Sequence, residues 1–529
     1  MDVTGNDSFY ITTAIPYVNS TPHIGFALEI VQTDAFARYH RLREDRTYFL
    51  TGTDENALKN VQAAEKEGIS TAELVERNSE RFQGLREYLD LSFDQFIRTS
   101  CDPLHEAGAE KIWRAVKSKG DIYKQYYSGL YCVGCERYYD EAELIEGRCP
   151  EHKTVPELIE EENYFFRLSR YQDELYDLIS SDRYRVVPES RKNEVLNFIS
   201  RGLQDFSISR SEQRARGWGL RVPDDPSQVI YVWFDALTNY INALDYAHDG
   251  PLYREFWVDN PHRVHVVGKD IIRFHAIYWP AMLLSAGIPL PETLLVHGFV
   301  VVDDTKISKS LGNAIDPVAL VGRYGTDAMR YYLLRVVSPT ADANFNIEHF
   351  ERVYNADLAN DLGNLVNRTV SMLERYRNGC TPVVGDRTSL EEEVRLVAAH
   401  VRETVVESMD EFDPQSALNA IWDLIKRLNV YVEESAPWTL AKAEKNGDGA
   451  AAEQLDSTLY TLVESVRLIG ALLEPLLSDT ARKIRLQVGL VEEPEGEWSG
   501  RLQWGRLEAG THVADPQPLF PRLEQAAAV

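Results

Sequence analysis

The chain has 529 residues, of which 44% are hydrophobic and 26% charged, a composition that excludes collagen-like and disordered chains and suggests several domains. Its formal charge of −27 repels phosphate backbones at long range, so any nucleic-acid site must be a local basic patch. The longest apolar stretch, Tyr278 to Leu290, is about thirteen residues long, short of the ~20 that a membrane helix needs. Residues 1–8 carry no secretory pattern, so we expect a cytoplasmic protein without a membrane span.

Strand and helix patterns alternate from the start of the chain. A β-branched and aromatic run at Phe9–Val18 precedes a helical pattern at Phe26–Leu42, and a second strand pattern follows at Arg46–Leu50. This alternation predicts an α/β fold with a Rossmann-like parallel sheet, whose ligand crevice lies at the carboxyl ends of the strands. We therefore expect the function to lie in the loops Tyr17–Gly25 and Thr51–Asn56.

The alternation is interrupted between residues 116 and 222 by short strand patterns, a cysteine cluster and two helical stretches. Strand patterns resume at Val229–Phe234, Arg263–Val267 and Thr293–Val302, so an inserted domain is predicted to split the sheet. From residue 347 the pattern is almost entirely helical, which predicts a separate bundle. The expected divisions are 1–115 and 223–300 for the two halves of the sheet domain, 116–222 for the insertion, 301–346 for a linker and 347–529 for the bundle.

Two loops have residues suited to binding phosphate. Pro22-His23-Ile24-Gly25 stands just before the first helix, where backbone N–H groups and the helix dipole attract anions and glycine permits close approach. Lys306-Ile307-Ser308-Lys309-Ser310 follows the last strand pattern, and its lysines can bring positive charge to a reacting phosphate. Taken alone, His23 is more often an ordinary loop histidine, and the lysine loop is as often a solvated surface loop.

Four residues in the interrupted region have the spacing of a zinc knuckle. Cys132 and Cys135 form one pair and Cys149 and His152 form another, each with two residues between its members. Four such ligands complete a tetrahedral zinc site and leave no open position for a substrate. The metal would therefore fold the insertion and take no part in catalysis. The alternative is a set of reduced, unrelated thiols.

The order of the two phosphate loops in a split sheet resembles the class I aminoacyl-tRNA synthetases, and further segments are similar to the methionyl-tRNA synthetase family with a single zinc knuckle. Those segments are Ala14–Asn19, Thr51–Glu55, Tyr231–Ala236, Gly268–Asp270, Phe274-His275 and Asn360–Asn364. The resemblance implies that the helical bundle binds an anticodon. It also implies a methionine–tRNA ligase, in which ATP with Mg²⁺ and L-methionine give methionyl-adenylate and pyrophosphate, and the methionyl group then passes to tRNA(Met).

The resemblance implies a role for each residue that matches a family motif. His23, Lys306 and Lys309 would be catalytic, and would bind ATP together with Gly25, Ser308 and Ser310. Methionine would bind among Ile15, Tyr17, Asp54, Trp233, Tyr240 and His275, with its ammonium group on Asp54 and its sulfur against the aromatic rings. Asn364, Arg368 and Trp438 would read the anticodon by hydrogen bonding and stacking. Cys132, Cys135, Cys149 and His152 would hold one structural Zn²⁺, and the protein would be a monomer.

Several positions depart from the family pattern. Phe26 stands where a second histidine is usual, Asn56 replaces a histidine and Leu237 a proline, whereas Ile307 is a conservative replacement of methionine. Phenylalanine cannot donate to phosphate, so other groups must supply that stabilisation. Two alternatives therefore stay compatible with the sequence. One is a duplicated paralogue that makes the adenylate but serves another acceptor or an auxiliary role, such as inhibitor resistance, and the other is a non-catalytic paralogue that only binds tRNA or a partner.

Overall fold

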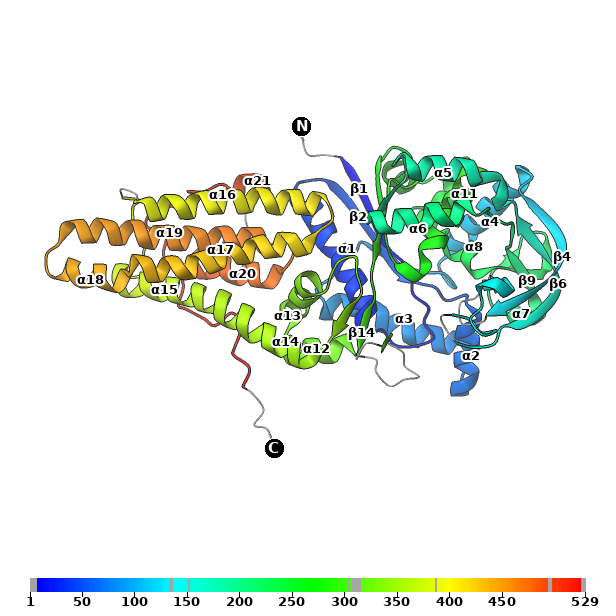
Figure 1. Cartoon of the computed structure of the whole chain (residues 1–529), viewed down its shortest axis with the longest axis horizontal. Helices are drawn as coiled ribbons and strands as arrows, with labels where there is room; N and C mark the ends of the chain where they lie inside the picture. Colours follow the sequence, from blue (N-terminus) through cyan, green and yellow to red (C-terminus); the bar gives the residue numbers. More distant parts are fainter. Residues whose placement is uncertain are drawn as a thin grey trace.

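The structure is a computed structural model that describes residues 7–132, 137–150, 153–302, 305–306, 315–385, 388–492 and 497–524, without the side chains of residues 137–138, 302 and 305–306. Figure 1 shows an elongated molecule with an α/β domain at one end and a helical bundle at the other. Helix α1 (Ile24–Leu42) lies where the two parts meet. Within the described ranges, no helix has the length and apolarity needed to cross a membrane.

A six-stranded sheet organises the α/β domain. Its strands follow the order β3-β2-β1-β12-β13-β7, and every neighbouring pair is parallel. The strands are β1 (Ser8–Thr13), β2 (Arg46–Thr53), β3 (Gln95–Arg98), β7 (Arg185–Val187), β12 (His262–Gly268) and β13 (Thr293–His297). After β3 the chain adds the edge strand β7 from within the inserted region and returns to the centre of the sheet at β12, so the predicted split parallel sheet is confirmed.

Helices cover both faces of this sheet because successive strand residues point to opposite sides. Phe9 and Ile11 pack into the core that contains α1 and α3 (Thr71–Tyr88). Tyr10 lies between them in sequence and packs instead into the core with α4 (Pro103–Ser118) and α11 (Trp279–Ala286). A sheet buried on both faces is typical of parallel α/β folds.

The predicted strand at Val229–Phe234 was wrong in its second half. Strand β11 (Asp225–Ile230) pairs antiparallel with β9 (Ser209–Ser211) and β10 (Arg221–Val222), outside the main sheet. Residues 232–236 form helix α8, all of whose side chains are buried. A short buried apolar run does not distinguish a strand from a helix by periodicity, which explains the error.

The predicted strand at Thr293–Val302 is two strands that belong to different sheets. It breaks after β13, and β14 (Val300–Val302) pairs with β15 (Thr305–Lys306) and β16 (Ala343–Phe345). Gly298 lies at the break, where a Cβ atom would come within 2.2 Å of the carbonyl carbon of Ala341. Only glycine permits this approach of two backbone segments, and the chain changes sheets there.

The inserted region contains an antiparallel sheet with the order β5-β4-β6-β8. Its strands are β4 (Ile122–Cys132), β5 (Arg137–Tyr139), β6 (Glu157–Phe166) and β8 (Phe206–Ser207), and the helices α5 (Gln172–Ser180) and α6 (Glu189–Ser200) lie between β6 and β8 in the chain. Strand β7 comes between these two helices but joins the main sheet beside β13. Part of the range 116–222 thus contributes to the α/β domain, which the sequence did not indicate.

The predicted helical bundle is confirmed. Its helices are α15 (Asn364–Arg377), α16 (Ser389–Asp410), α17 (Pro414–Ser435), α18 (Pro437–Lys445), α19 (Gly449–Leu473), α20 (Ser478–Gln487) and α21 (Trp498–Arg501). The linker helix α13 (Thr326–Tyr331) carries Arg330, which is fully buried and pairs with Asp34 of α1 at 2.7 Å. Arg330 also donates to the carbonyl of Leu476, so one guanidinium joins α1 to the bundle.

Candidate active site

The main cleft opens where the order of the strands reverses. From β1 the chain builds β2 and β3 on one side, whereas from β12 it builds β13 on the other, so a crevice forms between the carboxyl ends of β1 and β12. A cleft of about 630 Å³ lies there. Its walls come from the segments after three strands, residues 14–26 after β1, 268–274 after β12 and 297–300 after β13. This volume is typical of a small-molecule site.

His23 and Gly25 form the start of α1 at this cleft. His23 is the N-cap residue of the helix, and its Nδ1 accepts a hydrogen bond of 3.1 Å from the Gly25 N–H group. A Cβ atom on Gly25 would lie 3.0 Å from Cε1 of the His23 ring, so only glycine leaves the ring in place. The N-terminal N–H groups of α1 and the imidazole therefore lie together at the cleft, an arrangement suited to phosphate.

Phe26 adds an apolar wall to the cleft. Its ring is largely buried and makes an edge-to-face contact with Phe82 of α3, with 5.0 Å between ring centres. Both residues line the cleft. The phenylalanine thus packs against the neighbouring helix, and it supplies no hydrogen-bond donor where the family has a histidine.

A carboxylate–histidine pair lines the cleft one turn beyond Phe26, and the sequence did not single it out. Glu29 of α1 and His297 at the end of β13 approach to 2.7 Å, and both are buried. Glu29 also accepts from the Ala14 N–H group, and His297 Nδ1 bonds to the Gly298 carbonyl. Burial alone would lower the pKa of His297, but its hydrogen bond to Glu29 and the charge of that carboxylate raise it. A proton is therefore held between the two side chains.

Two further charged residues, to which the sequence assigned no role in the site, follow β12. Lys269 and Asp270 line the cleft directly after Gly268. Lys269 Nζ pairs with Asp342 at 2.6 Å and lies 4.5 Å from the centre of the Phe299 ring. The signal that could have found them is their position at the end of a central parallel strand, where ligand-binding residues gather.

An aromatic group lines the part of the cleft where the sequence places methionine. Trp233 of α8 stacks on Phe274 with 3.7 Å between ring centres and meets the edge of Tyr17 at 6.3 Å. Ile15, Tyr17 and Trp233 all line the cleft. Lys59 Nζ lies 3.8 Å from the centre of the Tyr17 ring, a cation–π contact that the sequence gave no means to foresee.

Asp54, Tyr240 and His275 lie close to this aromatic group but do not line the cleft. Each is buried, with no more than 2% of its surface exposed. The N–H group of Asp54 donates to the carbonyl of Pro16, which ties the end of β2 to the loop after β1. The predicted methionine residues therefore form two layers, one that faces the cleft and one behind it.

The buried layer holds one histidine in a defined state. His275 Nδ1 is 3.0 Å from the carbonyl of Ile271, which can only accept, so this nitrogen carries the proton. His275 Nε2 then accepts a hydrogen bond of 2.7 Å from the hydroxyl of Tyr240. Burial lowers the pKa of His275 to about 4 and raises that of Tyr240, so both side chains are neutral at pH 7.

Asn56 and Leu237, two residues that depart from the family pattern, lie at α8, the helix that carries Trp233. Asn56 donates to Asp235 of α8 at 2.7 Å and to the carbonyl of Thr99. Asp235 in turn pairs with the buried His105. Leu237 is buried at the end of α8. Asn56 therefore anchors the short helix that carries Trp233.

Several predicted site residues lie outside the described part of the chain. Ser308, Lys309, Ser310, Cys135 and His152 are among them, and for Lys306 only the backbone in β15 is described. Cys132 and Cys149 are described, and both are buried in a small cluster with Tyr139. In the described ranges, histidines, cysteines and carboxylates form no group of three or more that could hold a metal.

Two of the residues predicted to read an anticodon lie on one helix of the bundle, and the third lies at the start of another. Asn364 and Arg368 are four residues apart on α15 and so share one face of the helix. Arg368 pairs at 2.7 Å with Glu433, near the end of α17, and Trp438 begins the next helix with 45% of its surface exposed. In Figure 1, α18 lies at the end of the bundle that is remote from the sheet.

Together, the parallel sheet split by an insertion, the histidine-capped first helix at its cleft and the C-terminal helical bundle define a class I aminoacyl-tRNA synthetase. A family model described as "tRNA synthetases class I (M)" matches residues 9–155 and 142–370, and one for the anticodon-binding domain of methionyl-tRNA ligase matches residues 382–528. The chain belongs to the methionyl-tRNA synthetase family.

Similar proteins cover nearly the whole chain. The methionine–tRNA ligase of Caldanaerobacter subterraneus subsp. tengcongensis is 43% identical over 98% of this chain and 79% of its own length. The methionine–tRNA ligase of Bacillus subtilis is 42% identical over 98% of this chain and 78% of its own length. A crystal structure of Mycobacterium tuberculosis methionyl-tRNA synthetase bound by methionyl-adenylate is 40% identical, covers 97% of this chain and 100% of that one, and superposes with a TM-score of 0.92. A crystal structure of the apo form of the same M. tuberculosis enzyme is 38% identical, covers 99% of this chain and 100% of that one, and superposes with a TM-score of 0.86.

Proposed function

We propose that this chain is a methionine–tRNA ligase that activates L-methionine with ATP and transfers the methionyl group to tRNA(Met). The observation that carries the proposal is one continuous cleft that has the N-terminus of α1 with His23 on one wall and the aromatic group of Trp233 on another. A phosphate and an apolar amino acid can therefore bind side by side. The methionine carboxylate attacks the α-phosphate, pyrophosphate leaves, and a terminal tRNA hydroxyl then displaces AMP from the methionyl carbonyl.

The ATP end of the cleft works mainly by positioning charge. His23 and the N–H groups at the start of α1 bind phosphate oxygens, and Gly25 keeps the imidazole in place. Lys306, Ser308, Lys309 and Ser310 are assigned to the same phosphates by their match to the family motif. Mg²⁺ enters with ATP and supplies further charge neutralisation. Because Phe26 donates no hydrogen bond, these groups carry the stabilisation that a second histidine gives elsewhere in the family.

The methionine end is assigned to the two layers of residues described above. Ile15, Tyr17 and Trp233 provide an apolar, aromatic wall for the thioether. The carboxylate of Asp54 is assigned to the substrate ammonium group. Tyr240 and His275 stay neutral and present no charge to the sulfur, which suits a substrate side chain that is uncharged and largely apolar.

We further propose that Cys132, Cys135, Cys149 and His152 hold one structural Zn²⁺. The two described members support this, because Cys132 ends β4 and the Cys149 N–H group donates to the carbonyl of Thr154 at 2.8 Å. Both thiols are buried together. Pro150, next to Cys149, lines the main cleft, so the fold of this segment shapes the active site. Metal analysis should find one zinc per chain, and a Cys149→Ser variant should lose it.

Asn364, Arg368 and Trp438 are assigned to the anticodon. An exposed indole beside an amide and a guanidinium can stack on one base and hydrogen-bond to its neighbours. The division into domains at residues 115, 222, 300 and 346, the monomeric state and the cytoplasmic location stay predictions of the sequence.

The experiment that tests this proposal is amino-acid-dependent ATP–pyrophosphate exchange. Methionine should drive exchange, and isoleucine, leucine and cysteine should do so weakly or not at all. A Lys309→Ala variant should abolish it. Absence of methionine-dependent exchange in folded, zinc-loaded protein would instead support the non-catalytic paralogue, and exchange without tRNA charging would support a paralogue with another acceptor.

A further inference from the structure

A second and larger cavity, of about 800 Å³, lies at the other end of α1, between the last turns of that helix and helices α19, α20 and α21. We call it the arginine cavity. Seven arginines and only two carboxylates are among its lining residues: Arg38, Arg41, Arg467, Arg482, Arg485, Arg501, Arg506, Glu474 and Glu497. This sign of charge is the reverse of that of the whole chain, which has 56 basic and 83 acidic residues.

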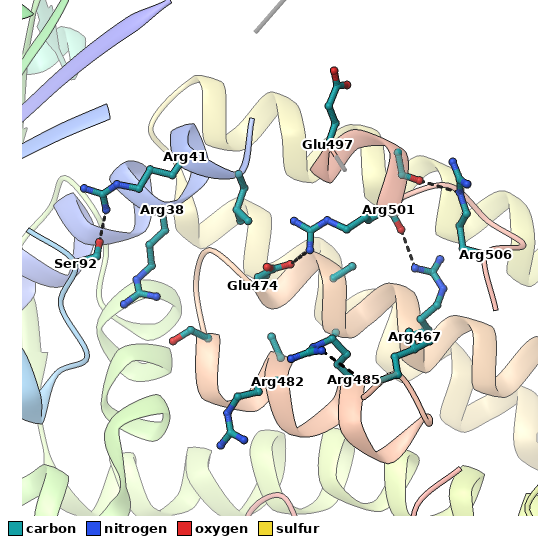
Figure 2. A pocket seen from close by; sticks show the side chains of 17 residues that line it. Arg38, Arg41, Ser92, Arg467, Glu474, Arg482, Arg485, Glu497, Arg501 and Arg506 are labelled. Atoms are coloured by element: carbon teal, nitrogen blue, oxygen red, sulfur yellow. Dashed lines mark hydrogen bonds and ion pairs between the residues drawn. The ribbon is translucent and has the colours of Figure 1, made fainter. Parts of the chain in front are cut away.

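The arginines approach from opposite walls. Figure 2 shows Arg38 and Arg41 on α1 across an open space from Arg485 on α20 and Arg501 on α21. In a chain of net charge −27, such a concentration of guanidinium groups facing one space is costly unless an anion or carboxylates offset it. Glu464 pairs with Arg467 and Asp479 with Arg482, so the cavity is a candidate site for an anion through the donors that such pairs leave open.

Carboxylates from outside the cavity lining orient several of these arginines. Arg38 pairs with Asp34 at 2.7 Å, and Arg41 pairs with Asp94 at 2.6 Å. Neither aspartate lines the cavity. A guanidinium has five N–H donors, so a group held from behind by one carboxylate still presents donors in front. These pairs fix the arginines in position without filling the cavity.

Two other arginines keep donors that no described group accepts. The terminal nitrogen of Arg501 pairs with Glu474 at 2.6 Å, but its Nε is buried without a hydrogen-bond partner. Arg506 donates to the carbonyl of Gly500 and to Gln503, and across the described ranges it pairs with no carboxylate. Arg506 is an exposed residue, so its guanidinium can donate to an anionic oxygen in the cavity, and charge-assisted hydrogen bonds of this kind are strong.

Apart from Ser92 and Ser478, the rest of the lining is apolar or glycine. Leu42, Gly470, Ala471, Ala481 and Leu490 form surfaces between the arginines. The combination of a guanidinium cluster, small apolar surfaces and a volume within the range of small-molecule sites fits a phosphorylated ligand with a flat or apolar part. An inorganic anion alone would leave much of this space unused.

We propose that the arginine cavity binds a small phosphorylated anion of the nucleoside polyphosphate class, at a site separate from the main cleft. Helix α1 has 19 residues and so spans about 28 Å between the two sites. A small ligand fits better than an RNA backbone, because the arginines come from several elements, α1, α19, α20 and α21, around a single cavity of about 800 Å³. The residues assigned to the anticodon also lie elsewhere, on α15 and α18 (Figure 1).

The test is calorimetric titration of the full chain with inorganic tripolyphosphate and, separately, with GTP. A non-hydrolysable methionyl-adenylate analogue first fills the main cleft, so that binding there is blocked. We expect saturable binding of one ligand per chain, with GTP tighter than tripolyphosphate. The double variant R482Q/R506Q changes two exposed residues. It should weaken binding at least about tenfold, because the loss of one charge-assisted hydrogen bond alone raises the Kd by about tenfold or more.

The matched control is R402Q, an arginine of α16 that lies outside the cavity lining and pairs with Glu403. It should leave the Kd unchanged, and both variants should keep methionine-dependent exchange, which shows that they fold. Three results would overturn the proposal: no saturable binding, equal weakening in R402Q, or a double variant that loses affinity only for tRNA. The last result would assign these arginines to an RNA surface.

Discussion

Replacing Trp438 by alanine should separate tRNA recognition from methionine activation. The indole is 45% exposed at the start of α18, so its removal takes little from the core of the bundle. Stacking of one unpaired base on an aromatic side chain is worth about 1–3 kcal/mol, which corresponds to a loss of roughly 5- to 150-fold in kcat/KM for tRNA. Methionine-dependent ATP–pyrophosphate exchange should stay unchanged, because the segments that line the main cleft belong to the α/β domain, which lies at the opposite end of the molecule from α18 (Figure 1).

The matched control for this prediction is Val430→Ala. Val430 lies on the neighbouring helix α17 and is 51% exposed, so truncation removes a comparable exposed apolar side chain that has no assigned role. We expect kcat/KM for tRNA to stay within about twofold, because a surface change of this kind usually costs less than about 0.5 kcal/mol. The stacking assignment would be refuted by equal losses in both variants, or by a loss of pyrophosphate exchange in Trp438→Ala.

Three further predictions concern α1 and the buried pocket layer. Gly25→Ala would place a Cβ atom 3.0 Å from the His23 ring, so we expect about a tenfold fall in the rate of adenylate formation, measured in single-turnover reactions with methionine saturating. Arg330→Met leaves the buried carboxylate of Asp34 with less compensation and should destabilise the chain by about 3 kcal/mol, seen as a lower denaturant midpoint at pH 7.5. His275 has a folded-state pKa of about 4, below that of the unfolded chain, so its contribution to stability is full above pH 6.5 and falls by about 2 kcal/mol at pH 5. Denaturation at pH 7.5 and 5 should show that His275→Gln lacks this part of the pH dependence; an unchanged dependence would contradict the assignment.

Features set by local sequence were predictable. The start of α1, the first two strands and the helical bundle follow from residue patterns whose period matches the element they form. The loop His23–Gly25 could be placed at the cleft because a loop between the first strand and helix of a parallel sheet must lie at its carboxyl edge. Family motifs then supplied the pocket residues Trp233, Tyr240 and His275, which no periodicity indicates.

Contacts between distant parts of the chain could not be predicted. Glu29 lies on α1 and His297 at the end of β13, and only the order of the strands in the folded sheet brings the two side chains together. Neither residue has a distinctive local pattern in the sequence. The pairing of β7 with β13 escaped notice for the same reason, since three residues inside an irregular region carry no period. Arg330 looks like a surface residue in sequence, and only the packing of α13 against α1 makes it a buried ion-pair partner.

The central claim is that this chain joins methionine to a tRNA that it recognises by the anticodon. The most direct measurement is aminoacylation with labelled methionine of two tRNA(Met) transcripts that differ only in the three anticodon bases. We expect efficient charging of the transcript with the methionine anticodon and a loss of at least about tenfold in kcat/KM for the other, the scale of one or two lost base contacts. Equal charging of both transcripts, or charging of neither by an enzyme that forms the adenylate, would contradict it.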